Sequence, residues 1–428
     1  MNKPLLFQSS ISKVSYKKYV HSSGLTLYFM EMKDRAKKAA MISAKFGSIH
    51  FSFKDPEGNA VTVPNGTAHF LEHKLFEGEH GGAFEYYGKT GAKANAYTSN
   101  DKTSYYFICT DHFERNLDCL LRFITNPYLT DENVEKEKGI IAQEIKMYDD
   151  EPVWQGYFSM VRGLYRNHPI RRDIAGTVEE IQTLTPKLLK CCYKTYYHPS
   201  NMVLSVAGDI NPETVLKAAD RYFEKASPFS IQSPQFDEPE ESGLQYTEKE
   251  MLVSKPIFHL GFKDIHTDIS GYSLSKKEME VEILLEYLFG RSSPFFLHQY
   301  ECGNINGEYD CWYDLSDYFS FCVLSGESND PRAVEEAVSA QVEQFLRDGV
   351  DHERFVEIRN GLYGSLMAET DQAFSMVNRM AGNYLNQSEM IDAFEALLKI
   401  TDEDLLKRAK EIFRKECSCL SVILPVKE

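Results

Sequence analysis

The sequence predicts an α+β protein made of two homologous mixed domains in tandem, each a sheet packed with helices. Three observations predict this fold class. The chain has 428 residues, of which 43% are hydrophobic, so it is too long for one ordinary core and apolar enough for two. Strand-like and helix-like segments alternate without the regular period of a parallel sheet. A weak repeat also relates the two halves of the chain.

In the first half, residues 39–46 and 104–109 alternate between apolar and polar side chains and predict two strands. An amphipathic helix is expected over 113–125. A further helix begins at the Thr-Pro-Lys-Leu-Leu-Lys segment of residues 185–190 and leads to a buried strand over 202–208. The first half therefore combines strands and helices in irregular order.

The second half ends in a similar way. Thr-Asp-Glu-Asp-Leu-Leu-Lys at 401–407 begins a helix that leads to a strand over 419–425, and long amphipathic helices are expected over 334–348 and 353–370. Between the halves lies a segment rich in proline, serine and acid, which predicts a linker. We place the domain boundaries as follows: 1–226 for the N-terminal domain, 227–252 for the linker and 253–428 for the C-terminal domain.

The stretch His69-Phe-Leu-Glu72-His73 indicates a metal-binding site with a base beside it. It follows Pro64 and Asn65, which are helix-start signals, and an apolar series continues through it. Two imidazoles one helical turn apart leave the same face and can bind one metal ion, while Glu72 stands beside them as a base toward water. This order is the inverse of the commoner zinc-peptidase motif. The alternative is a solvated helix with two incidental histidines.

A catalytic zinc ion usually takes three protein ligands and keeps one position for water, so a third ligand is expected on another element. A helix is predicted after Thr130, which caps it, and before Pro152. Glu137 and Glu144 lie two turns apart on one face of that helix. We expect Glu144 to be the third ligand and Glu137 to orient a histidine of the ligand set. A solvated acidic helix face is the alternative.

Composition excludes several classes of protein. The formal net charge of −17 argues against nucleic-acid binding and mildly favours basic or neutral peptides as substrates. No apolar run reaches the roughly 18 residues of a membrane span, and the first ten residues lack a signal-peptide core. We therefore expect a cytoplasmic protein with no membrane partner. The nine cysteines lack framework or metal spacing and are expected to be ordinary thiols.

Together these motifs resemble the insulinase/pitrilysin family of zinc endopeptidases, which includes mitochondrial processing peptidase and similar bacterial members. The resemblance rests on the inverted motif, the downstream Glu137 and Glu144 pair, and the Asn-Ala-Tyr-Thr run at 95–98, and it spans nearly the whole chain. Three further segments fall where the family has similar strands: 24–28, 46–48 and 201–209. The sequence of residues 69–77 looks most like that of a bacterial branch of the family associated with elongation factor P modification.

The resemblance implies two domains facing each other across a cleft, zinc as the cofactor and a peptide as the substrate. It implies that Asn95 and Ala96 contact the substrate at an exposed strand edge. It also implies a mechanism in which Glu72 removes a proton from the attacking water and passes it to the leaving amine. The predicted activity is that of a zinc metalloendopeptidase.

The sequence departs from the family in its second half. The resemblance places an arginine-tyrosine pair there to bind the oxyanion, but Tyr300 stands where the family has arginine, and Tyr309 is left to supply the tyrosine. Arginine offers a fixed charged fork that tyrosine cannot imitate. In some two-subunit members, one chain keeps the zinc motif and its partner keeps the pair. We therefore expect this chain to be the metal-bearing half of a heterodimer with a homologous zinc-less partner, or else a homodimer.

The second half also lacks the metal motif. An ungapped alignment of the halves puts Glu282, Leu285 and Glu286 at the motif positions and Leu366 at that of the third ligand. The N-terminal domain is therefore expected to be the zinc-binding, peptidase-like one. The alternative function is a non-catalytic binding or scaffold subunit that retains zinc, although a structural zinc site needs no general base such as Glu72. Hydrolysis of a non-peptide bond has only shared chemistry in its favour.

Overall fold

The chain folds into two compact units, each of which takes segments from both halves of the sequence. The first unit consists of residues 1–145, 173–234 and 367–391, and the second of 146–172, 235–366 and 392–428. The computed structural model describes residues 4–9, 11–79, 81–226, 229–232, 234–267 and 269–426. Among the helices it describes, none is both long and apolar enough to cross a lipid bilayer.

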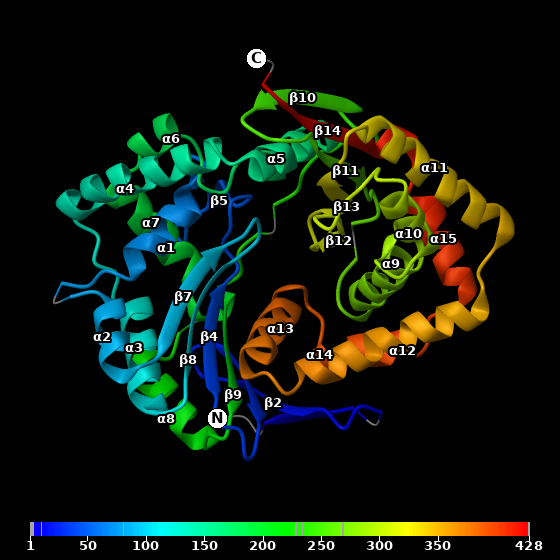
Figure 1. Cartoon of the computed structure of the whole chain (residues 1–428). Helices are drawn as coiled ribbons and strands as arrows, with labels where there is room; N and C mark the ends of the chain where they lie inside the picture. The colour runs from blue at the N-terminus through cyan, green and yellow to red at the C-terminus, as the bar shows by residue number, and fades with distance from the viewer. Residues whose placement is uncertain are drawn as a thin grey trace. The chain divides into compact units, whose positions relative to one another are not determined.

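The first unit is built on a seven-stranded sheet (Figure 1). In the order in which neighbours pair, its strands are β1 (Leu5–Gln8), β2 (Ser15–Val20), β3 (Thr26–Glu31), β9 (Met202–Gly208), β4 (Lys38–Ala44), β8 (Thr103–Cys109) and β7 (Lys93–Thr98). Strands β3 and β9 are parallel, and the other neighbouring pairs are antiparallel. A separate ribbon joins β5 (Ser52–Lys54) to β6 (Ala60–Thr62).

Helices cover both faces of this sheet because side chains alternate along each strand. Leu27 and Ile42 point to one face and share a hydrophobic core with seven helices. These helices are α1 (Thr67–Leu75), α2 (Ala83–Thr90), α3 (Phe113–Thr125), α4 (Asp131–Asp149), α6 (Val178–Gln182), α7 (Pro186–Tyr196) and α8 (Pro212–Tyr222). On the other face, the ring of Tyr106 contacts Phe374 of α13 (Ala373–Leu385).

The second unit repeats the plan with a five-stranded sheet. Its strands pair in the order β10 (Tyr246–Met251), β14 (Ser418–Pro425), β11 (Ile257–Lys263), β13 (Ser320–Glu327) and β12 (Asp310–Leu315). Strands β10 and β14 are parallel and the rest antiparallel, which is the pattern of β3, β9, β4, β8 and β7 in the first unit. Helix α5 (Pro152–Leu164) packs on this sheet, where Met160 and Leu164 share a core with Phe321.

The remaining helices follow along the second half of the chain. They are α9 (Tyr272–Phe289), α10 (Pro294–Glu301), α11 (Pro331–Asp348), α12 (His352–Glu369), α14 (Met390–Leu397) and α15 (Asp402–Ile412). Three short 3-10 helices complete the described structure: η1 (Pro169–Arg171), η2 (Pro199–Asn201) and η3 (Lys415–Cys417).

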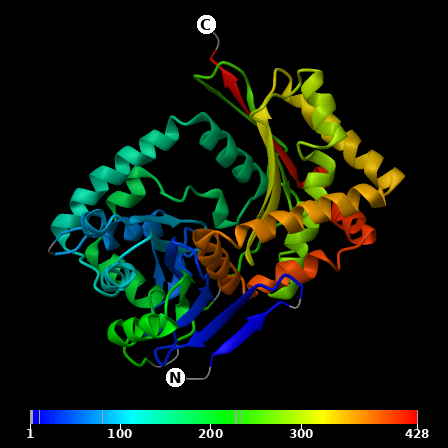
Figure 2. The same cartoon turned by 60° about the horizontal axis from the view of Figure 1, so that its bottom comes forward.

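Two helices are exchanged between the halves of the sequence. Helix α13 comes from the second half but belongs to the first unit, and α5 comes from the first half but belongs to the second unit. Figure 2 shows α13, in orange, against the strands of the first sheet, where it contacts β9 and β4. The predicted domains, 1–226 and 253–428, do not include this exchange of helices, and their boundaries stay a prediction.

The predicted fold class is confirmed: each unit is a sheet packed with helices. The helix expected over 113–125 is α3, and the strand expected over 202–208 is β9. Thr185 and Thr401 cap α7 and α15, because their side chains accept hydrogen bonds from backbone N–H groups of the first turn. These local capping signals can be read directly from the sequence.

The predicted linker at 227–252 is partly structured, and residues 227, 228 and 233 lie outside the described residues. Its residues Tyr246–Met251 form β10, which was not predicted. The charged run Glu248-Lys-Glu conceals this strand because β10 lies at the edge of the sheet, where exposed positions take charged side chains.

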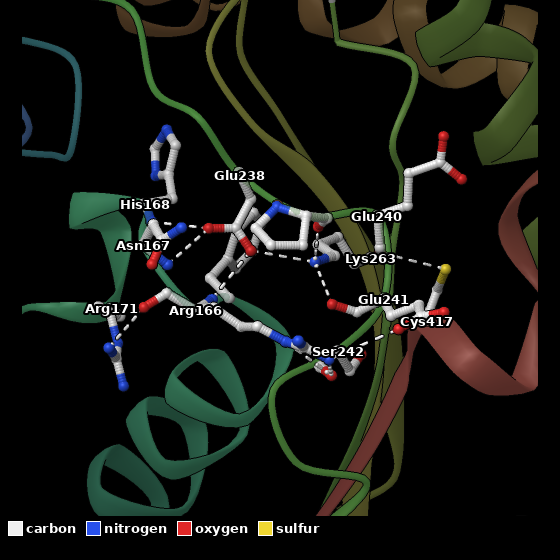
Figure 3. A network of polar contacts seen from close by, with 12 residues as sticks. Arg166, Asn167, His168, Arg171, Glu238, Glu240, Glu241, Ser242, Lys263 and Cys417 are labelled. Atoms are coloured by element: carbon white, nitrogen blue, oxygen red, sulfur yellow. Dashed lines mark hydrogen bonds and ion pairs between the residues drawn. The ribbon is translucent and has the colours of Figure 1, made fainter.

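Glu238 anchors the segment before β10 (Figure 3). Its carboxylate accepts hydrogen bonds of 2.9, 2.7 and 2.8 Å from the backbone N–H groups of residues 166–168. It also pairs with the buried Nζ of Lys263 at 3.1 Å. Lys263 donates further hydrogen bonds to the backbone carbonyls of Pro239 and Glu241. This part of the predicted linker is therefore fixed within the second unit.

Candidate metal centre

Helix α1 presents His69, Glu72 and His73 at consecutive turns. Leu71 and Leu75 hold the helix in the core of the first unit, and both are fully buried. The spacing of these apolar residues leaves the two histidines on one face, with ring centroids 4.6 Å apart.

Gly66 sets where this helix begins. Its φ of 81° lies in the left-handed region that favours glycine, and a Cβ there would collide with the carbonyl oxygen of Ala175. Thr67 follows and donates from Oγ1 to the carbonyl of Pro64 at 2.6 Å. The helix start, and with it the direction of the histidines, is therefore fixed by close packing.

Glu144 of α4 approaches both histidines. His69 Nε2 lies 3.6 Å from Glu144 Oε1, and His73 Nε2 lies 3.4 Å from Glu144 Oε2. Ligand atoms of a tetrahedral zinc site lie about 3.4 Å apart when each bond is about 2.1 Å long. The ligand atoms of the three residues all lie within 4.8 Å of one another, and the described residues contain no other such group of three. This donor set fits a zinc ion.

Glu137, two turns before Glu144 on α4, contacts the outer side of His73. Its Oε1 lies 3.1 Å from His73 Nδ1, and its Oε2 lies 3.2 Å from the Nζ of buried Lys74. A proton on His73 Nδ1 is then held by the carboxylate, so Nε2 can accept a metal ion. On His69, Nδ1 is buried without a hydrogen-bond partner among the described residues.

The charges around His73 shift its pKa. Burial works to lower the pKa of His73, but the hydrogen bond to Glu137 and the negative charge of Glu144 outweigh burial and raise it. Burial works to raise the pKa of Glu137, but the hydrogen bond from His73 and the charge of Lys74 outweigh it and lower the pKa. Both pKa shifts come in part from the attraction between the Glu137 carboxylate and the His73 imidazole, which strengthens the hydrogen bond between them.

Glu72 is largely buried, with 9% of its surface exposed. Thr98 of β7 donates a hydrogen bond from Oγ1 to Glu72 Oε2 at 2.6 Å. Burial raises the pKa of Glu72, while the hydrogen bond from Thr98 and the nearby histidines oppose that shift. A raised pKa makes this carboxylate a better proton acceptor than an ordinary glutamate.

The predicted substrate contacts Asn95 and Ala96 lie on β7, which neighbours α1. This strand is the last in the order of the seven-stranded sheet and pairs with β8 on one side. Asn95 is exposed, and its side-chain oxygen accepts a hydrogen bond from the backbone N–H of Ala96 at 2.9 Å. An open strand edge can pair with the backbone of an extended peptide.

Tyr309 is the last of the predicted site residues. It lies in the second unit, is 1% exposed, and packs against the ring of Phe296 at 5.6 Å. Burial raises the pKa of its hydroxyl well above the ordinary value. Apolar packing therefore turns this side chain into the second unit, and its contact with a substrate stays a prediction. Tyr300, where the resemblance implies an arginine, is exposed.

Two residues near the histidines, Lys74 and Thr98, are not indicated by the sequence. Lys74 is fully buried and pairs with Glu77 and Glu137, and its only signal is its position next to His73. Thr98 ends the Asn-Ala-Tyr-Thr run, but nothing local indicates that its hydroxyl reaches α1. Both contacts depend on packing between elements that are distant in the sequence.

Comparison with known proteins gives matches along most of the chain. The family described as Insulinase (Peptidase family M16) matches residues 59–178, and the one described as Peptidase M16 inactive domain matches residues 183–362. An uncharacterized zinc protease of Bacillus subtilis, YmfH, is 36% identical over 412 residues, which is 95% of each chain. The beta subunit of mitochondrial-processing peptidase from Caenorhabditis elegans is 34% identical over 169 residues, 37% of this chain and 36% of that protein.

Solved structures agree in fold. A crystal structure of an M16-like peptidase from Alicyclobacillus acidocaldarius superposes with a TM-score of 0.92 and 31% identity, over 96% of this chain and 98% of that one. Pitrilysin gives a TM-score of 0.75 at 15% identity, over the whole of this chain and 47% of that one, so it shows likeness of fold alone.

Proposed function

The chain belongs to the insulinase family of peptidases, M16, and we propose that within this family it is a zinc-dependent endopeptidase acting on peptides or short unfolded protein segments. Zinc is the cofactor. The observation that carries the proposal is the approach of His69, His73 and Glu144 to within 4.8 Å of one another, with Glu72 on the same helix as the histidines.

Each residue then has a role. His69, His73 and Glu144 would hold the ion, and Glu137 would orient the ring of His73. A bound zinc ion supplies Lewis acidity toward water and the scissile carbonyl. Glu72 accepts the proton of the attacking water and returns it to the leaving amine nitrogen as the peptide bond breaks.

The substrate would lie along β7. In this proposal the backbone at Asn95 and Ala96 pairs with an extended peptide, so that affinity comes from main-chain hydrogen bonds. The chain's net charge of −17 favours basic or neutral segments over acidic ones.

Glu72→Gln tests this function against a scaffold that merely retains zinc. The amide keeps the size of the side chain but cannot accept a proton, so we expect peptide turnover to fall by at least about 100-fold. Zinc content, measured by elemental analysis, should stay at the wild-type level. In His69→Ala, by contrast, zinc and turnover should be lost together. Unchanged turnover in Glu72→Gln would sink the proposal.

We further propose that this chain is the metal-bearing subunit of a heterodimer. Tyr300 supplies no cation where the family has arginine, and the hydroxyl of Tyr309 is buried. One relative of this chain is a subunit by name, the beta subunit of a processing peptidase. A homologous zinc-less chain would bring the missing arginine-tyrosine pair.

The test compares peptide cleavage by the purified chain alone and together with a homologous zinc-less chain. We expect turnover to rise strongly when the partner is added, with a mixed dimer seen by light scattering. Equal turnover by the lone chain would contradict the heterodimer and leave the peptidase proposal intact.

A further inference from the structure

A pair of threonine hydroxyls lies behind Glu72 in the first unit. Thr98 of β7 and Thr103 of β8 are directly opposite each other in the sheet register. Thr98 Oγ1 lies 2.6 Å from Glu72 Oε2 and 3.3 Å from Thr103 Oγ1. The two hydroxyls and the carboxylate therefore form one polar chain at the end of the β7–β8 hairpin.

The geometry fixes where each proton points. Thr103 is fully buried, and its Oγ1 donates to the carbonyl oxygen of Phe46 at 2.7 Å. A threonine hydroxyl has a single proton, so Thr103 has none left for Thr98. The proton of Thr98 has two possible acceptors, and the carboxylate of Glu72 is both closer and charged. Thr98 therefore donates to Glu72.

The local backbone holds Thr98 in place. The turn after it is closed by a hydrogen bond from Ser99 N to Lys102 O at 2.8 Å and by Ser99 Oγ to Asp101 at 2.7 Å. Gly47 packs directly on the backbone of Asn100, where a Cβ would have no room. A β-branched side chain on such a fixed hairpin has few alternative positions.

We propose that Thr98 is a positioning residue for Glu72. It holds Oε2 of the carboxylate and leaves Oε1 as the oxygen that receives the proton of the attacking water. This inference rests on the proposed function of Glu72 as the base. The bond also keeps the carboxylate from rotating away, in a place where the negative charge of Glu144 lies nearby.

The experiment compares three variants of the zinc-loaded enzyme, with its partner if one is needed for turnover. Thr98→Val keeps the shape of the side chain and removes the hydroxyl, so kcat should fall about 10- to 100-fold, as expected for a misplaced reacting group. KM and zinc content should not change. Thr98→Ser keeps the hydroxyl and should restore kcat to within a few-fold of wild type.

Thr90→Val is the matched control. It removes a hydrogen bond of the same length, 2.6 Å to Asn116 Oδ1, from another partly buried threonine of the first unit. We expect kcat to be unchanged. In the Glu72→Gln background, Thr98→Val should cause no further loss, because Thr98 acts through Glu72.

The inference is overturned if Thr98→Val has wild-type kcat, or if it causes the same loss with Gln at position 72. Failure of the proposed function looks different, because the wild-type enzyme would then cleave no peptide with or without a partner. In that case crystal structures of wild type and Thr98→Val decide the matter. The Glu72 carboxylate should move in the variant, and an unmoved carboxylate would refute the positioning role.

Discussion

At the scale of single residues, His73 is held from two sides. Its Nε2 faces Glu144 at 3.4 Å and its Nδ1 faces Glu137 at 3.1 Å. A ring held in this way loses little conformational entropy when it binds a metal ion. The carboxylate at Nδ1 also makes Nε2 a better metal ligand. The proposed zinc site therefore includes a supporting residue, Glu137, that is not itself a proposed ligand.

The first prediction removes that support. Glu137→Gln replaces a charged acceptor by a neutral amide, so we expect zinc affinity to fall by about 10- to 100-fold. Competition with a chelator of known affinity measures this change. Glu135→Gln is the control. Glu135 lies on the same helix, but its side chain is exposed and forms a surface ion pair with Lys138, which contributes little to stability. Equal zinc affinity in both variants would contradict the role of Glu137.

A second residue-level prediction concerns pH. His259 of β11 is buried at 1% exposure beside Gly156, where a Cβ would have no room. Burial lowers the pKa of His259 from 6.5 to about 4. Between pH 6.5 and 4 the unfolded chain therefore binds a proton that the folded chain does not, so stability falls as pH falls through this range. The loss amounts to up to about 3 kcal/mol, at 1.36 kcal/mol for each pKa unit.

His259→Leu tests this pH dependence. The variant has no group to protonate at this position, so its apparent Tm should fall less than that of wild type between pH 7 and pH 4.5. Burial also lowers the pKa of His50 and of His168 to about 4, so wild type and variant should both lose stability in acid. Identical slopes of Tm against pH would show that His259 does not contribute.

At the scale of elements, the segment before β10 is held by one carboxylate. Glu238 satisfies three backbone N–H groups of the loop after α5 and pairs with Lys263 of β11. Removing it takes the carboxylate partner from Lys263, which is 2% exposed, and the acceptor from three backbone N–H groups. The loss at the buried lysine is the costly part. The network therefore joins a loop, a strand and the predicted linker within the second unit.

The third prediction is that Glu238→Ala lowers the free energy of unfolding of the second unit by about 2–4 kcal/mol. Urea denaturation followed by fluorescence measures it. Glu241→Ala is the control, because the side chain of Glu241 is exposed and lies 3.7 Å from Arg166, so its loss should change stability by less than about 0.5 kcal/mol. A Glu238 variant as stable as the Glu241 variant would contradict this account.

At the scale of the whole molecule, the two units share one strand order and have exchanged one helix each. The order β3, β9, β4, β8, β7 in the first unit corresponds to β10, β14, β11, β13, β12 in the second, with the parallel pair in the same place. Helix α13 covers a face of the first sheet and α5 a face of the second. Each half of the sequence therefore supplies one helix that packs on the sheet formed by the other half.

The fourth prediction follows from this exchange. A fragment of residues 1–234 lacks α13, and a fragment of 235–428 lacks α5, so each leaves an apolar sheet face uncovered. We expect each fragment alone to bind a hydrophobic dye and to lack native near-ultraviolet circular dichroism. Co-expression should restore both properties. A fragment 1–234 that unfolds cooperatively at the wild-type Tm would show that α13 is dispensable.

The sequence by itself determined the local features. The inverted motif puts His69, Glu72 and His73 on one stretch of helix, and Thr185 and Thr401 mark helix starts, because helical period and capping act over a few residues. The class of fold followed from the alternation of strand and helix patterns. A polar edge strand was missed, since its charged residues look like a linker.

Only the tertiary structure decided which distant residues meet. The sequence indicates Glu144 as a partner of the two histidines, and the structure brings its carboxylate to 3.6 and 3.4 Å from them. The contact of Thr98 with α1, the burial of Tyr309 and the exchange of α5 and α13 between the units depend on the packing of whole faces. A local sequence pattern indicates that one face of an element is apolar or acidic, but it does not indicate which other element packs on that face. The pairing of elements is a property of the complete chain, and the chemistry proposed for Glu72 depends on it.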